Sequence, residues 1–228
     1  NYAHARWGPA TMAIYHDSEF LMNRPWLEEY LERYPRETPG WPWWASCRAD
    51  MMAKWPDLVR ALHREAHWHC FSIGLESGSQ KVLDIMNKQT TVEQNEQAIE
   101  LVNQLCDEAV AEGRVAPVIF ANIMMGTPGE EPEDAFATMR MLSRIKRVIP
   151  SLSLFTPYPG STLGNQMIAE GRSLDVHKSY HRFPNEAKLA GIDYGFYGRL
   201  FSGEYDKECG LNVRELMSRQ GSAGEAMR

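Results

Sequence analysis

Short apolar runs alternate with longer segments of helical periodicity, and this alternation constrains the fold more than any other feature of the sequence. The apolar runs cover residues 11–15, 43–47, 70–73, 117–125 and 152–156. Such alternation is typical of βα units that build a parallel sheet. Five βα steps with right-handed crossovers predict an α/β chain that forms a partial (βα) barrel of the TIM type.

Local signals mark where several helices begin. Pro25, Pro56 and Pro132 each stand where a helix would start, and the missing N–H of proline costs little in a first turn. Thr91 and Gln94 have the spacing of a capping box at the start of a long helix. The run at residues 117–125 is apolar almost throughout, which predicts a strand that is buried on both faces.

Length, composition and charge limit the class of protein. The chain has 228 residues, of which 43% are hydrophobic, and a formal net charge of −6. We predict a core barrel over residues 1–171 and a C-terminal extension over residues 172–228, with a flexible Gly- and Ser-rich end from Gly210 onward. The acidic balance argues against a nucleic-acid partner, because phosphate contacts require a basic surface. No apolar run approaches the roughly 20 residues of a membrane helix, so we expect no membrane segment.

Cysteine usage points to a reducing compartment. Cys47, Cys70, Cys106 and Cys209 are scattered along the chain and show neither a disulfide framework nor metal-knuckle spacing. This predicts a cytoplasmic protein whose cysteines are small buried hydrophobic residues.

Polar and Gly/Pro-rich residues follow the predicted strands where each strand ends. In a βα barrel the reactive loops lie at the C-terminal ends of the strands, so these side chains should converge on one mouth. The candidate cofactor-binding residues are Asp17, Arg48, Glu76, Ser77, Asn122, Gly126 and Pro159.

The strings around these residues resemble those of a known enzyme superfamily. Three of them are IGLESGS at residues 73–79, LDIMNK at 83–88 and MGTPGE at 125–130. Together with TPYPGS at 156–161 they resemble the radical S-adenosylmethionine (SAM) enzymes, in particular the cobalamin-associated branch. Two further strings extend the resemblance, which covers residues 11–167: DSEF at 17–20 and WASCRAD at 44–50.

The resemblance implies a SAM site at the barrel mouth. It places Asp17 near the ammonium group of SAM, Glu76 on the ribose hydroxyls, and Arg48 on the methionyl carboxylate. Gly126 would allow close backbone approach to the adenine. Pro159 belongs to a loop that would add backbone contacts.

The resemblance also implies a [4Fe-4S] cluster held by a CxxxCxxC loop after the first barrel strand. No such spacing occurs in the sequence. Because residues 11–17 resemble the second strand, we expect the cluster ligands upstream of Asn1 and interpret the chain as an N-terminally truncated fragment. The full-length parent would be a radical SAM enzyme for radical chemistry or methyl transfer on a small-molecule or unknown substrate. A reductant such as a flavodoxin or ferredoxin would serve it, and a cobalamin domain would also lie upstream. The fragment alone is expected to be inactive.

Two other functions stay open at this point. One is a non-catalytic barrel remnant. The other is a metal-dependent barrel hydrolase that uses His63, His67 and His69, although these residues precede the third strand and so belong to the stability face of a barrel.

Individual residues also have structural interpretations. Asp17 and Glu76 could cap the following helices, and Arg48 could pair with Asp50. The acidic residues at 130–134 are explained by the macrodipole of the helix that Pro132 begins.

Overall fold

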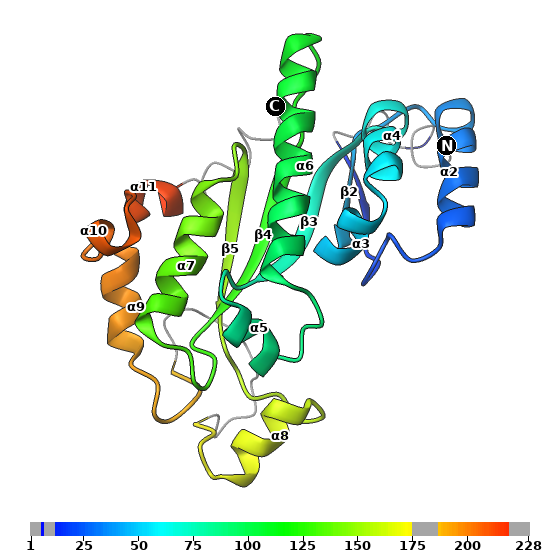
Figure 1. Cartoon of the computed structure of the whole chain (residues 1–228). Coiled ribbons are helices and arrows are strands. Elements are labelled where there is room, and N and C mark those ends of the chain that lie inside the picture. The colour runs from blue at the N-terminus through cyan, green and yellow to red at the C-terminus, as the bar shows by residue number, and fades with distance from the viewer. Residues whose placement is uncertain (1–5, 7–11, 175–186, 219–228) are drawn as a thin grey trace.

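Five parallel strands form one sheet whose spatial order follows the chain order (Figure 1). The computed structural model describes residue 6 and residues 12–174 and 187–218. The strands are β1 (Ala13–Tyr15), β2 (Trp43–Cys47), β3 (Trp68–Glu76), β4 (Val118–Met125) and β5 (Val148–Leu154). Each predicted apolar run overlaps one strand. The α/β architecture is therefore confirmed, and the sequential all-parallel order is consistent with a partial barrel.

Helices follow each strand and complete the described part of the chain. They are α2 (Arg24–Glu37), α3 (Ala49–Lys54), α4 (Pro56–Ala66), α5 (Gln80–Ile85), α6 (Val92–Ala111), α7 (Pro132–Ser143), α8 (Thr162–Ala169), α9 (Tyr194–Phe201), α10 (Asp206–Cys209) and α11 (Val213–Ser218). The predicted capping box is confirmed at α6, where Thr91 and Gln94 bond reciprocally. No helix in these ranges is long and apolar enough to cross a membrane.

Two strands differ most from the predicted runs. β5 begins at Val148 and includes Pro150, whereas the predicted run began at residue 152. Because β5 pairs only with β4 in the sheet, it is an edge strand and tolerates a proline. β3 continues past Gly74 to Glu76, and its register against β4 shifts between these two residues.

The two faces of the sheet differ in chemistry. One face is buried against the helices and supplies much of the main core. The opposite face has an apolar layer at the N-terminal ends of the strands, formed by Cys70, Val118 and Ile149. Beyond it the same face carries Ser46, Ser72, Asn122, Ser151 and Ser153. We call this part of the sheet the polar face.

The expectation of a fourth strand buried on both faces is wrong. Phe120, Asn122 and Met124 of β4 are only half-buried, while their neighbours Ala121 and Ile123 are buried. The apolar run therefore has one face in the core and one face toward the open side of the sheet.

Two tryptophans anchor the core at the N-terminal ends of the central strands. The rings of Trp43 and Trp68 are fully buried and stack with centroids 4.9 Å apart and planes within 8°. The Trp43 indole N–H donates to the Ala66 carbonyl at the end of α4. Phe71 packs on Trp68 at 4.3 Å, so these aromatic rings join β2, β3 and α4.

The C-terminal helices pack into the same core. Phe196, Leu200, Val213 and Leu216 of α9 and α11 are buried members of it. The end expected to be flexible from Gly210 onward thus includes a packed helix, while residues 219–228 lie outside the described residues. The division at residue 171 stays a prediction.

Gly78 lets the loop after β3 lie directly on α7. A Cβ added there would meet the Ala137 carbonyl oxygen at 2.5 Å, and backbone cannot move aside as a flexible side chain can. We expect Gly78→Ala to lower the free energy of unfolding by about 2 kcal/mol. Gly198 in α9 is the matched control, because a Cβ there meets nothing within 4 Å; Gly198→Ala should raise stability by about 0.5–1 kcal/mol. Urea denaturation measures both, and equal stabilities would contradict this packing.

Candidate functional site

A cleft of about 280 Å³ opens on the polar face at the C-terminal ends of the strands. We call it the polar cleft. Its lining residues are Ser18, Ser46, Cys47, Arg48, Ser72, Gly74, Glu76, Lys88, Asn122, Ile123, Met124 and Ser153. A second space of about 860 Å³, the outer hollow, shares Glu76, Lys88 and Met124 with it. The outer hollow reaches α5 and α8, which lie at the same end of the sheet (Figure 1), and Pro159 lines it.

An ion pair lies where the polar cleft meets the outer hollow. Lys88 Nζ lies 3.0 Å from Glu76 Oε1, and only about a fifth of each side chain is exposed. Gly74 makes room for the pair, because a Cβ there would lie 2.8 Å from Lys88 Nζ and 3.0 Å from Glu76 Oε1. Glu76 was expected from the sequence. Lys88 was not among the candidates, although it ends the string at residues 83–88.

Backbone strain is concentrated around this ion pair. Four non-glycine residues in the described ranges have a positive φ, and three of them are Glu76 (61°), Asn87 (52°) and Gln89 (58°). A left-handed conformation costs an L-residue about 1–2 kcal/mol. Such strain persists where the surrounding structure enforces it, and it is common at binding sites. Here it sets the direction of the Glu76 side chain, while strained Asn87 and Gln89 flank Lys88.

Arg48 links two walls of the polar cleft. Its guanidinium bonds to both carboxylate oxygens of Asp50, at 2.9 and 3.1 Å, and this pairing raises the arginine pKa. It also donates to the Lys88 carbonyl at 3.3 Å and the Thr90 hydroxyl at 3.3 Å. The structural ion pair with Asp50 is therefore present, in a residue that also lines the cleft.

Asn122 lies on the polar face of the sheet and lines the polar cleft. It is aligned with Gly74 across the β3–β4 pair, and its side-chain N–H donates to Ser72 Oγ at 3.0 Å. The structure thus brings together Arg48, Glu76 and Asn122 around one space.

Asp17 lies outside the linings of both spaces. It is exposed, and its carboxylate accepts from the Glu19 amide at 3.5 Å. The more buried acid at this strand end is Glu19. It accepts from the Leu21 amide at 2.9 Å, and burial raises its pKa. Glu19 Oε2 is buried without a hydrogen-bond partner.

Ser77 and Gly126 lie on the helix side of the sheet. Ser77 is fully buried and its hydroxyl bonds to Thr138 of α7 at 3.1 Å. Gly126 is buried with φ +72°, and a Cβ there would contact Ile192, Leu154 and Tyr197. Neither residue lines the polar cleft, so the roles of Ser77 and Gly126 toward a cofactor stay predictions.

Glu130 is a functional candidate that sequence reasoning missed. It was explained by the dipole of α7, but it precedes that helix and turns inward. Its Oε2 accepts from the amides of Gly126 (2.5 Å) and Thr127 (3.1 Å) and from the Tyr197 hydroxyl (2.9 Å). Burial raises the pKa of Glu130 to about 7. The signal in the sequence was a glutamate directly after a loop with two glycines.

The histidines lie at the other end of the sheet. His63 Nδ1 bonds to the Trp68 carbonyl at 2.8 Å, and burial lowers the pKa of His69 to about 4. Among residues 12–174 and 187–218, no three His, Cys, Asp or Glu side chains are grouped so that they could hold a metal ion. The hydrolase alternative therefore finds no ligand set in this part of the chain.

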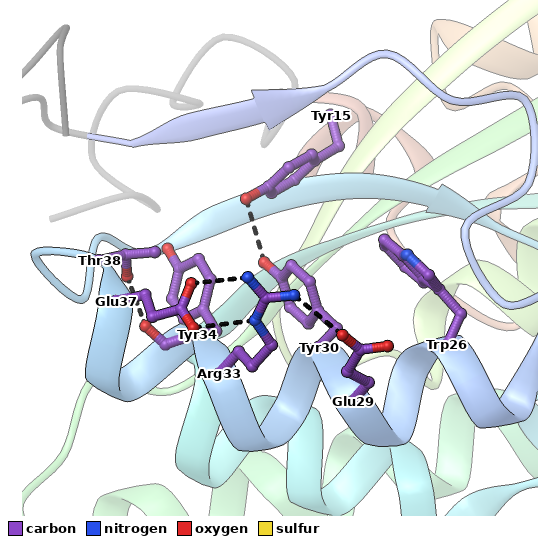
Figure 2. A pocket seen from close by; sticks show the side chains of 8 residues that line it. All are labelled: Tyr15, Trp26, Glu29, Tyr30, Arg33, Tyr34, Glu37 and Thr38. Carbon is purple, nitrogen blue, oxygen red and sulfur yellow. Dashed lines mark hydrogen bonds and ion pairs between the residues drawn. The ribbon is translucent and has the colours of Figure 1, made fainter.

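A further pocket of about 240 Å³ lies between α2 and β1 (Figure 2). Trp26, Tyr30 and Tyr34 form a stacked row along α2, and Tyr30 donates to the Tyr15 hydroxyl at 3.0 Å. Arg33 forms ion pairs with Glu29 and Glu37, the two glutamates that line this pocket, so the charged groups of the pocket already pair with one another.

The strain at Glu76 can be measured with two substitutions that remove the same carboxylate. Glu76→Gly and Glu76→Ala both lose the ion pair to Lys88, but only glycine adopts φ 61° at low cost. We expect the glycine variant to be more stable than the alanine variant by about 1 kcal/mol in urea denaturation. An alanine variant of equal or greater stability would contradict the strain.

Glu130 should contribute a pH-dependent term to stability. Its folded pKa of about 7 is above the usual 4.5, so its contribution is fully present below pH 4.5 and is lost as pH rises through 7. We expect the unfolding free energy of the wild type minus that of Glu130→Gln to fall by on the order of 3 kcal/mol between these limits, at about 1.4 kcal/mol per pKa unit. Denaturation of both proteins at pH 4.5, 6 and 8 measures it. If the difference in unfolding free energy does not change with pH, the pKa of Glu130 is not raised by folding.

Comparison with known proteins gives distant relatives, while no protein-family model matches the chain. The chain is 27% identical over 162 residues to the anaerobic magnesium-protoporphyrin IX monomethyl ester cyclase of Rubrivivax gelatinosus, which covers 71% of this chain and 27% of that protein. It is 23% identical over 161 residues to an uncharacterised methyltransferase of Pyrococcus horikoshii, covering 71% and 32%.

A third relative is the tRNA-2-methylthio-N(6)-dimethylallyladenosine synthase of Dictyoglomus thermophilum. It is 30% identical over 99 residues, which are 43% of this chain and 20% of that protein. The chain spans about a third or less of the length of these relatives. The chain is a distant relative of the radical SAM enzymes.

Proposed function

We propose that the chain binds S-adenosylmethionine in the polar cleft, as the SAM-binding part of an enzyme for radical chemistry or methyl transfer. The observation that carries the proposal is the strained, partly buried Glu76–Lys88 pair beside Arg48 at the strand ends. The distant relationship to radical SAM enzymes supports it.

The charges of the polar cleft complement those of SAM. Lys88 and Arg48 are cations that can bind the methionyl carboxylate, and Glu76 can accept hydrogen bonds from the ribose hydroxyls. Glu76 and Lys88 neutralise each other in the free protein. A bound ligand with a carboxylate and hydroxyl groups would replace this ion pair by two new contacts, one from the carboxylate to Lys88 and one from the hydroxyls to Glu76. Neither charged group would then be buried without a partner.

The shape of the site also fits a ligand of this size. Small-molecule pockets are typically about 300–1,000 Å³ with a few placed polar groups, and the two connected spaces of about 280 and 860 Å³ reach that range. Asn122 and Ser46 provide hydrogen-bonding groups on the polar face, while Met124 and Pro159 provide apolar surface for a base or a substrate.

The described residues do not fit an iron–sulfur cluster. The four cysteines are buried, and burial raises the pKa of Cys70 to about 12 and that of Cys106 to about 11, which keeps them as thiols. They are not grouped as metal ligands in the part of the chain that the structure describes. A cluster would need thiolates from outside these residues. The cobalamin link and the flavodoxin- or ferredoxin-type reductant stay predictions.

A small molecule is the favoured substrate class. The outer hollow carries Asp84 and Glu76, and its cation Lys88 is paired with Glu76. In this proposal Lys88 leaves Glu76 to bind the methionyl carboxylate, and the phosphates of a nucleic acid would need further cations beyond those that line the outer hollow, so an uncharged substrate is favoured.

Binding of S-adenosylhomocysteine, measured by isothermal titration calorimetry, tests the proposal. We expect saturable binding to the wild-type chain and affinity losses of at least tenfold, about 1.4 kcal/mol, for Glu76→Gln and for Lys88→Met. Lys81→Met is the matched control, because Lys81 bonds to Asp134 away from the polar cleft. A wild-type chain that does not bind would favour the non-catalytic remnant instead.

A further inference from the structure

The carboxylate of Glu130 joins the loop between β4 and α7 to a helix far along the chain. Its Oε2 accepts from the Gly126 and Thr127 amides at 2.5 and 3.1 Å. The same oxygen accepts from the hydroxyl of Tyr197, at 2.9 Å and 67 residues later in sequence. Glu130 Oε1 is buried without a partner, so all the bonds recorded for this carboxylate converge on one oxygen.

The loop needs such an acceptor because its backbone turns sharply. Gly126 and Gly129 both have left-handed φ values, of +72° and +87°. Within the loop, the Glu130 amide donates to the Thr127 carbonyl at 2.9 Å. The amides of Gly126 and Thr127 point inward, where an unpaired N–H would cost about 1–3 kcal/mol. Glu130 therefore sets the course of the chain directly after β4.

Tyr197 supplies the connection to α9. Its side chain is 5% exposed and its ring packs edge-on against Phe196 with centroids 5.1 Å apart. The other acid that faces Glu130 is Asp134 of α7, which is bonded to Ser79 at 2.7 Å and Lys81 at 3.1 Å. Asp134 is thus engaged elsewhere, and the Tyr197 hydroxyl is the donor that α9 brings to Glu130.

We propose that Glu130 and Tyr197 form a latch through which helix α9 holds the β4–α7 loop in the conformation that the adenosyl ligand requires. The loop begins one residue after Met125, and the preceding Met124 lines both the polar cleft and the outer hollow. Glu130 and Tyr197 are positioning residues that act through the backbone of this loop. The ligand in this inference rests on the proposed function, whereas the ordering of the loop does not.

Hydrogen–deuterium exchange of the chain tests the latch without any ligand. Tyr197→Phe removes only the hydroxyl, and we expect the exchange rates of the Gly126 and Thr127 amides to rise at least tenfold while those of β3 stay unchanged. Tyr205→Phe is the control, because the Tyr205 hydroxyl bonds to Arg199 and not to the loop. Unchanged exchange at Gly126 and Thr127 in Tyr197→Phe would overturn the latch.

Substitutions of the acceptor provide an independent test by conservative rescue. Glu130→Gln keeps an acceptor oxygen and should retain part of the protection of both loop amides. Glu130→Leu has no acceptor oxygen and should lose the protection of both loop amides. Equal protection in the Leu variant and the wild type would overturn the latch. Tyr197→Phe decides the matter if the Leu variant does not fold.

The positioning role is tested by affinity for S-adenosylhomocysteine. We expect Tyr197→Phe to weaken binding about three- to tenfold, whereas Glu76→Gln should weaken binding without changing loop exchange. Faster loop exchange with unchanged affinity would overturn the positioning role. A wild-type chain that does not bind would instead remove the proposed function, and the exchange experiment would still decide whether the latch exists.

Discussion

A parallel sheet has two faces, and the fold depends on how this chain uses each of them. One face is packed against helices and holds the stacked tryptophans and the aliphatic residues of β3 and β4. The other face is apolar only near the N-terminal ends of the strands. Toward the C-terminal ends it carries serines and an asparagine, which cannot form a hydrophobic core. The space above these residues is therefore suited to a polar ligand, and the charged side chains gather at its rim.

Much of the fold could be predicted, because the periodicity of hydrophobic residues and the signals for helix starts are local properties of the sequence. The five strands and the capping box at Thr91 and Gln94 follow from residues close to one another. No helix was predicted at the positions of the short helices α3 and α8. Pro150 hid the start of β5, because its tolerance depends on an edge position that only the sheet order reveals.

The site was predictable in part, for a similar reason. Strand ends could be located, so Arg48, Glu76 and Asn122 were expected to meet and do meet. Which way a side chain turns after a strand depends on single φ values. The left-handed φ of Glu76 directs its side chain to the polar cleft, while Ser77, the next residue, points into the core beside α7. Lys88, the partner of Glu76, comes 12 residues later, and Tyr197, the partner of Glu130, comes 67 residues later. Neither pairing follows from helix or strand periodicity.

The stacked pair of Trp43 and Trp68 has a consequence for optical measurements. Both indoles are buried at the first residues of their strands, at the end of the sheet opposite the polar cleft. Their fluorescence therefore reports the integrity of the core and is insulated from events at the strand ends. The chain has seven tryptophans, so a variant in which the other five are replaced by phenylalanine would let this pair serve as an internal reference for global unfolding.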